Sequence, residues 1–139
     1  MINTSTPAGA RAAERLRHDR IGWMTTVNAD GQPQASPVWF LWEEGEVLVF
    51  SRPAARRMTN LRANPRVSFN LDSERQGGHI VSLEGEARVV PGAPLAHQVP
   101  AYLDKYRDAI AAEGWTPEGM GEDYCATVRI RVTRVRTWE

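Results

Sequence analysis

The residues best suited to chemistry in this sequence are arginines that gather in one short, acid-free stretch. No Asp or Glu occurs from residue 47 to residue 71, and the same window holds five arginines, namely Arg52, Arg56, Arg57, Arg62 and Arg66. Phosphate is bound by dense positive charge together with fixed N–H donors, which the start of a helix after a strand provides. Ser51 adds a hydroxyl at the end of the preceding strand, and Asn60 adds an amide about one turn after Arg57. The stretch indicates an anion site, with a solvated basic helix face as the alternative.

Other clusters of reactive residues do not occur in the sequence. His18, His79 and His97 are widely scattered and Cys125 is the only cysteine, so we expect no metal site. The sequence contains neither Gly-x-Ser-x-Gly nor Gly-x-Gly-x-x-Gly, so it supports neither a serine hydrolase nor a Rossmann dinucleotide fold. No obligatory catalytic side chain follows from the sequence. Tyr124 could donate a proton, although a structural role is more common for a tyrosine.

The overall composition is that of an ordinary globular protein. The 139 residues are 42% apolar and 24% charged, which predicts one folded domain over residues 1–139. Seventeen basic residues balance 17 acidic ones, so net charge gives no reason to expect a nucleic-acid partner. The longest apolar runs fall far short of the roughly 20 residues that a membrane-spanning helix needs. With a polar N-terminus and a single cysteine, we expect a cytoplasmic protein without disulfides.

The elements that must position the arginines are mostly strands. Residues 21–27 alternate in the manner of a strand, and Asp30-Gly31 is a hairpin turn signal. A second strand is predicted over about residues 34–42. Near its end both of its faces are apolar, because Val38 and Phe40 point to one face and Trp39 points to the other. Such a strand needs a core on one side and a partner subunit or a ligand on the other. Residues 46–51 then form the third strand.

The rest of the chain predicts three further strands and three helices. Thr6 and Pro7 begin an N-terminal helix, and Pro53 fits the first turn of a helix that ends at Asn64-Pro65. Strands follow at residues 67–71 and 79–90. A helix around Tyr106 is stopped by Gly114, and a glycine-rich connection over residues 116–121 leads to the last strand.

The alternation of the last strand breaks at Arg134-Val135, which indicates a β-bulge or the exit of the strand from the core. Six strands joined by short turns, with a few helices and no βαβ unit, predict an α+β fold built on a six-stranded antiparallel barrel.

In this setting, the stretch SRPAARRMTNLRANPR at residues 51–66 resembles the phosphate-binding signature of the pyridoxine 5′-phosphate oxidase-like superfamily. The hairpin TTVNADGQP, the strand SPVWF and the element EGEA have the order and spacing of that superfamily. The segments QVPAYLDKY and GWTP are similar to one subgroup, the class B flavin/deazaflavin oxidoreductases of actinobacteria that use coenzyme F420. The resemblance covers nearly the whole chain and implies an FMN-binding split β-barrel.

The resemblance also implies a homodimer with two cofactor sites at its interface, which would account for the two-sided strand around Trp39. Arg57 stands where the family usually has a phosphate-binding lysine, and several relatives have arginine at the position of Ala55. Arg52 or Arg56 can replace that lost charge, with a different geometry of the phosphate contacts. Carried over position by position, the cofactor-binding residues are Pro37, Val38, Trp39, Ser51, Arg52, Arg56, Arg57 and Asn60.

The implied activity is hydride transfer from reduced coenzyme F420 to a small organic substrate, for which quinones, nitroaromatics and unsaturated ketones all remain open. One alternative is an oxidoreductase of the same fold that uses FMN. Another is a non-catalytic protein that binds a cofactor, or a basic patch for nucleic acid. A nucleic-acid binder would show a steep salt dependence.

Overall fold

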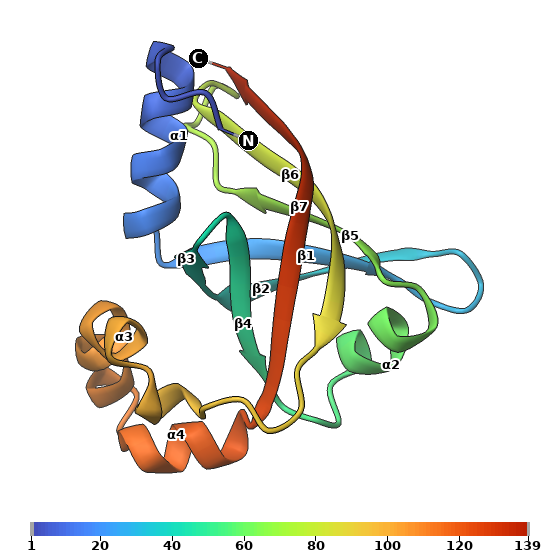
Figure 1. Ribbon diagram of the computed structural model, residues 1–139, viewed down its shortest axis with the longest axis vertical. Coiled ribbons are helices and arrows are strands. Elements are labelled where there is room, and N and C mark those ends of the chain that lie inside the picture. Colours follow the sequence, from blue (N-terminus) through green and yellow to red (C-terminus); the bar gives the residue numbers. More distant parts are fainter. Residues whose placement is uncertain (1, 139) are drawn as a thin grey trace.

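The computed structural model describes residues 2–138 and consists of one curled antiparallel sheet with helices around it (Figure 1). The sheet has seven strands in the order β2-β1-β5-β6-β7-β4-β3. The strands are β1 Ile21–Val27, β2 Pro33–Trp39, β3 Leu41–Glu43, β4 Glu46–Ser51, β5 Arg66–Leu71, β6 Ile80–Val89 and β7 Ala126–Trp138. The helices are α1 Pro7–His18, α2 Arg56–Ala63, α3 Pro100–Ala112 and α4 Pro117–Asp123, with a 3-10 turn η1 at Ala96–Gln98. The predicted α+β barrel class is confirmed, but the strand count is seven rather than six.

The extra strand arises because the predicted second strand breaks at Phe40. β2 ends at Trp39 and β3 begins at Leu41, and these two strands form the opposite edges of the sheet. At the break, the backbone N–H of Phe40 donates to the hydroxyl of Tyr106 at 2.8 Å, and the Nζ of Lys105 donates to the Phe40 carbonyl at 2.9 Å. Side chains from α3 therefore replace the strand partners that the Phe40 backbone gives up.

The apolar residues form two clusters that cover both faces of β4. One cluster fills the inside of the curled sheet, with Phe40, Val49, Phe69, Leu83 and Ile130 among its members. The other lies between the sheet and the α3–α4 region, with Leu48, Phe50, Tyr102, Tyr106 and Met120 among its members. In Figure 1, α3 and α4 lie together at one end of the sheet, while α2 lies on the opposite side near the tip of the β1–β2 hairpin.

The β-bulge that the sequence indicates lies in β7, one residue before the predicted position. Glu84 pairs with Arg134 and Gly85 pairs with Val132, so Thr133 is the extra residue. A Cβ at Gly85 would lie 2.5 Å from the carbonyl oxygen of Arg131, so only glycine permits this approach of β6 to β7. The bulge explains why the alternation of buried residues changes phase within a single strand.

The observed helix boundaries agree with those predicted from the sequence, except near the arginine-rich stretch and after Gly114. Thr6 caps α1 as predicted, accepting from the N–H of Gly9 at 3.0 Å, and Gly114 follows α3 with a φ of 77°. The helix predicted from Pro53 begins only at Arg56, because Pro53 lies in a turn that precedes it. The connection predicted over residues 116–121 was wrong, since it lies largely within α4.

Two local features explain α4. Thr116 caps it by accepting from the N–H of Gly119 at 3.0 Å, and Met120 is buried in the second cluster. Tertiary packing thus outweighs the low helix propensity of the glycines. Within residues 2–138, the helices are too short or too polar to span a membrane.

Candidate functional site

Two hollows meet at Arg57, at the end of the sheet that faces α3 and α4. The first, which we call the aromatic hollow, has a volume of about 320 Å³. Besides Arg57, its walls include Pro37, Val38, Trp39, Tyr102, Trp115 and Tyr124. The second, the basic hollow, has a volume of about 220 Å³ and is lined by Gln34, Ser36, Ala55, Arg56, Arg57 and Asn60 among others. A site of this shape suits a ligand with a planar ring at one end and an anion at the other.

Arg57 is half-buried and its guanidinium is held by two serine hydroxyls. Its Nη1 donates to the Oγ of Ser51 at 3.0 Å, and its Nη2 donates to the Oγ of Ser36 at 3.2 Å. Within residues 2–138, it forms no ion pair with a carboxylate. Burial lowers the pKa of Arg57, while the nearby Tyr124 raises it, and an arginine stays charged at neutral pH. A partly desolvated cation without a carboxylate partner is suited to bind an anion.

Of the two serines, only Ser51 was predicted from the sequence as a site residue. Ser51 was predicted as a direct phosphate contact, but it is fully buried, with 0% of its surface exposed. Its hydroxyl donates to the carbonyl of Arg52 at 3.1 Å while accepting from Arg57, so it orients the guanidinium. Ser36 was not predicted as a site residue. The sequence signal that could have found it is the family-like strand SPVWF, which begins at Ser36; in the structure Ser36 pairs with Met24 on β1.

Asn60 lines the basic hollow, where we expected it, but its amide nitrogen already donates two hydrogen bonds within the protein. It donates to the hydroxyl of Thr26 and to the side-chain oxygen of Gln34, both at 2.9 Å. Both amide hydrogens are therefore used. Asn60 ties α2 to β1 and β2, and so fixes the position of the helix start relative to the sheet.

The N-terminus of α2 supplies the N–H donors that the sequence analysis expected. Ala55 is the N-cap and offers no side-chain cap, and its carbonyl accepts from the N–H of Met58 at 2.9 Å, so the donors left at the helix start are the N–H groups of Arg56 and Arg57. Arg56 is the first helical residue and lines the basic hollow with an exposed side chain. Positive partial charge from the helix and two guanidinium groups thus converge on one small space.

Five aromatic residues line the aromatic hollow, namely Trp39, Phe50, Tyr102, Trp115 and Tyr124. Trp39 stacks on Tyr106 at 4.8 Å with the two rings 7° apart, and Trp115 approaches Trp39 at 5.9 Å. Arg52 was predicted beside a phosphate but instead packs over the ring of Tyr124 at 4.8 Å. Pro37, Val38 and Trp39 all line this hollow, which is the place predicted for a cofactor ring.

The α3–α4 region also contributes to the aromatic hollow, which the sequence did not predict. Tyr102, Trp115 and Met120 line it from this region, which was taken for a helix followed by an irregular connection. The Thr-Pro pair at residues 116–117 was a usable signal for the start of α4.

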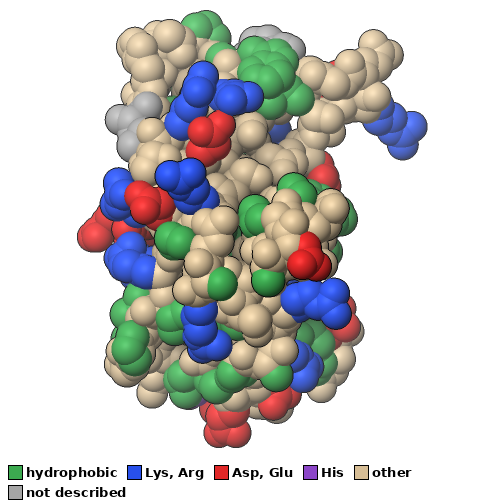
Figure 2. Space-filling model, turned by 90° about the vertical axis from the view of Figure 1, so that its right-hand side faces the viewer, with side chains coloured by type: hydrophobic (Ala, Val, Ile, Leu, Met, Phe, Trp, Pro, Cys, Tyr) green, Lys and Arg blue, Asp and Glu red, His purple; other side chains and the backbone are tan. Residues whose placement is uncertain are grey.

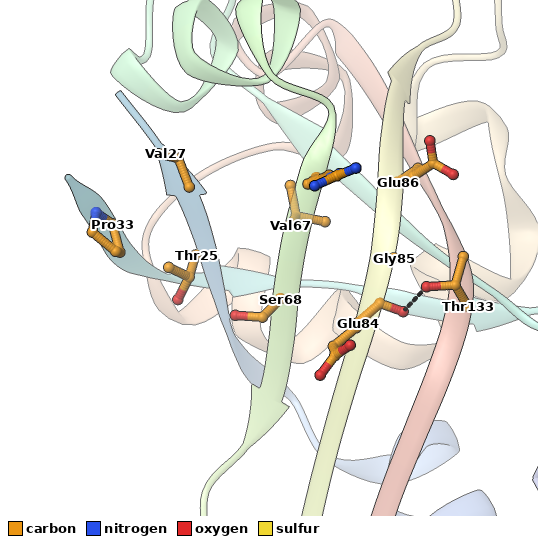
Figure 3. Close-up of a pocket in the computed structure, with 10 residues that line it drawn as sticks. Thr25, Val27, Pro33, Val67, Ser68, Glu84, Gly85, Glu86 and Thr133 are labelled. Carbon is orange, nitrogen blue, oxygen red and sulfur yellow. Dashed lines mark hydrogen bonds between the residues drawn. The ribbon is translucent and has the colours of Figure 1, made fainter. Parts of the chain in front are cut away.

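A third hollow, of about 540 Å³, lies on the outward face of the sheet (Figure 3). Side chains of Thr25, Ser68, Glu84 and Glu86 line it, and Thr133 donates to the carbonyl of Glu84 at 3.2 Å. The carboxylate of Glu84 pairs with Arg136 and that of Glu86 with Arg131. Arg66 of the acid-free window also lines this hollow, so the hollow combines one arginine with two carboxylates that are paired elsewhere. The surface seen in Figure 2 likewise has basic and acidic side chains next to one another.

Comparison with known proteins identifies the family of the chain. The sequence profile of the family described as pyridoxamine 5′-phosphate oxidase matches residues 9–139. Among solved structures, a conserved hypothetical protein of Mycobacterium tuberculosis, Rv2991, is 28% identical with a TM-score of 0.75, covering 94% of this chain and 83% of that one.

Two more distant structures share the fold and carry descriptive names. A protein named F420 reductase is 21% identical with a TM-score of 0.65, covering 88% of this chain and 94% of that one. A FAD-binding protein of Mesorhizobium loti is also 21% identical, with a TM-score of 0.62, covering 91% of this chain and 90% of that one. Because the family profile spans nearly the whole sequence, the chain belongs to the pyridoxamine 5′-phosphate oxidase family.

Proposed function

We propose that this protein is an oxidoreductase that uses coenzyme F420 as its hydride carrier to reduce a small organic substrate. The observation that carries the proposal is Arg57, a half-buried cation without a carboxylate partner in residues 2–138, placed where an aromatic and a basic hollow meet. Membership of a family with oxidoreductases, and a fold shared with a protein named F420 reductase, support the choice of chemistry.

The residues present fit a flavin-type cofactor. The aromatic hollow, at about 320 Å³, falls in the size range of small-molecule pockets, and its walls of Trp39, Trp115 and Tyr124 suit a planar ring. Arg56, Arg57 and the N-terminus of α2 would hold the phosphate. When bound, the cofactor supplies the hydride; the chain holds the ring, neutralises the anion and excludes water through its aromatic walls.

One observation favours FMN as the alternative cofactor. Of the five arginines in the acid-free window, Arg52 packs over Tyr124, and only Arg56 and Arg57 line the basic hollow. Two cations and a helix start match a single phosphate. Coenzyme F420 has an acidic tail in addition, which must then lie outside the basic hollow, near exposed arginines.

We further propose that two copies of the chain form the functional unit, as the family resemblance implies. β1 and β2 contain no charged residue, and their outward face carries Trp23, Val27, Pro33 and Pro37. An uncharged face on two paired strands at a sheet edge is suited to burial against a second copy. Light scattering coupled to gel filtration tests this: a particle of one 15.5-kDa chain would contradict it.

Titration of the protein with each cofactor under anaerobic conditions separates the candidates, read by quenching of tryptophan fluorescence. Tight binding of FMN with no response to coenzyme F420 would overturn the leading proposal. Tight binding of coenzyme F420, with oxidation of its reduced form by a quinone, supports it. Binding without turnover of any tested acceptor would instead support a non-catalytic cofactor-binding protein.

Replacement of Arg57 tests the anion site directly. Arg57→Ala removes a charge-assisted contact and should weaken cofactor binding by about 10- to 100-fold, because such hydrogen bonds contribute roughly 1.5–3 kcal/mol. Arg62→Ala is the matched control, since Arg62 is an exposed arginine of the same helix and lines neither hollow. Equal cofactor affinities of the two variants would refute the assignment of Arg57.

A further inference from the structure

Ser36 connects strand β2 to the first turn of helix α2 through its hydroxyl group. Its Oγ accepts two hydrogen bonds from the guanidinium of Arg57, from Nε at 3.3 Å and from Nη2 at 3.2 Å. Side chains alternate along β2, so Ser36 shares a face with Gln34, whose side-chain oxygen accepts from Asn60 of α2 at 2.9 Å. The Ser36 hydroxyl therefore lies on the α2 side of the strand, beside Arg57, and both residues line the basic hollow.

Ser36 differs from Ser51 because its hydroxyl hydrogen is still available. The Ser51 hydroxyl donates to the carbonyl of Arg52 at 3.1 Å, and Ser51 is fully buried. Ser36 is partly exposed, and within residues 2–138 its hydroxyl accepts from Arg57 but donates to no protein group. A hydroxyl has one hydrogen to donate and two lone pairs that accept. Ser36 thus leaves one donor for a ligand in the basic hollow.

The charge of Arg57 favours the use of this hydrogen by an anion. The guanidinium repels the hydroxyl hydrogen, which therefore turns away from it, and the bonds accepted from the cation make the hydroxyl a stronger donor. Of the five N–H donors of Arg57, three are bonded to the two serines, which leaves two for a ligand. An anion that meets these two N–H groups in the basic hollow lies next to the Ser36 hydroxyl.

We propose that Ser36 binds the ligand directly, and that its hydroxyl donates a hydrogen bond to an oxygen of the cofactor phosphate. This inference rests on the proposed function, because it adds a contact within the same anion site. Ser36 provides a neutral donor from β2, while Arg56, Arg57 and the backbone N–H groups at the helix start provide donors from α2. The phosphate is then held between the strand and the helix, and its position no longer depends on α2 alone.

Ser36→Ala tests the contact, with Ser51→Ala as the matched control. Each change removes one serine that holds Arg57, but only Ser36→Ala also removes a hydroxyl hydrogen that a ligand can use. Each protein is titrated with coenzyme F420 and with FMN, well below its melting temperature. Binding should weaken by about 10- to 100-fold in Ser36→Ala, because a hydrogen bond to a charged group is lost, and by less in Ser51→Ala.

The same change in an Arg57→Ala background separates a direct contact from an effect that acts through Arg57. If Ser36 only orients the guanidinium, its replacement has no effect on cofactor affinity once Arg57 is removed. A direct contact predicts that Ser36→Ala weakens binding by a further factor of about three or more in that background. Quenching of tryptophan fluorescence at high cofactor concentration measures both dissociation constants.

The outcomes separate this inference from the proposed function. A larger loss of affinity in Ser36→Ala than in Ser51→Ala, which persists without Arg57, supports it. A loss no larger than that of Ser51→Ala overturns it, and so does an effect that vanishes in the Arg57→Ala background, since Ser36 is then a positioning residue only. Both results leave the proposed function intact. If the unmodified protein binds neither cofactor, the proposed function itself fails, and the Ser36 contact fails with it.

Discussion

The break between β2 and β3 should depend on one hydroxyl group, and replacement of Tyr106 by Phe is the sharpest test of how the sheet closes. The Tyr106 hydroxyl accepts from the N–H of Phe40 at 2.8 Å and lies 2.6 Å from the carbonyl of Arg20. Phe40 is fully buried, at 0% exposed, so its N–H has no access to water once this acceptor is lost. Its carbonyl keeps the bond from Lys105.

The expected cost follows from these contacts. The change removes two hydrogen bonds, one from the Phe40 N–H and one to the Arg20 carbonyl, and leaves a buried N–H without an acceptor; together these losses destabilise the protein by about 2–3 kcal/mol. A chain of this size gains on the order of 0.3 kcal/mol/K of entropy on unfolding, so the melting temperature should fall by about 7–10 °C. The aromatic ring remains, and its stacking on Trp39 should survive the change.

Calorimetry and urea unfolding of Tyr106→Phe, each beside the unmodified protein, measure this effect. A loss below about 1 kcal/mol would show that the Phe40 N–H finds another acceptor, and the role given to Tyr106 would be wrong. Tyr102→Phe provides the internal comparison, because the two tyrosines are one helical turn apart on α3 and differ mainly in whether the hydroxyl is partnered.

Two further changes test the packing of β6 against β7 and the environment of α3. Gly85→Ala places a Cβ 2.5 Å from the Arg131 carbonyl oxygen, so the free energy of unfolding should fall by about 2 kcal/mol or more. Urea unfolding measures this loss. A loss below about 0.5 kcal/mol would contradict the close approach of β6 to β7. Burial lowers the pKa of Lys105 to about 8, so between pH 8 and the ordinary lysine pKa of about 10.4 the unfolded chain binds more protons than the folded one. The unfolding free energy should therefore rise with pH across that window relative to Lys105→Met, and parallel pH profiles of the two proteins would refute this.

Much of the architecture was accessible from residue patterns because those patterns reflect local geometry. Alternating burial along β5 and the cap at Thr6 depend on neighbouring residues in the chain, so both were predicted correctly. The division of the second strand was not, because apolar residues continue through Phe40 without interruption. Where the chain leaves one sheet edge, Lys105 and a tyrosine 66 residues later bind the backbone of Phe40.

From the sequence alone, five arginines without an acid in one window predict an anion-binding group near the start of α2. The sequence also determined the family, through the order and spacing of its motifs. The folded structure was needed to show how each arginine is held. Serines from two different strands hold Arg57, whereas Arg52 packs over the ring of Tyr124 and does not line the basic hollow. Such choices depend on side chains brought together from distant parts of the chain, and no spacing within a short segment encodes them.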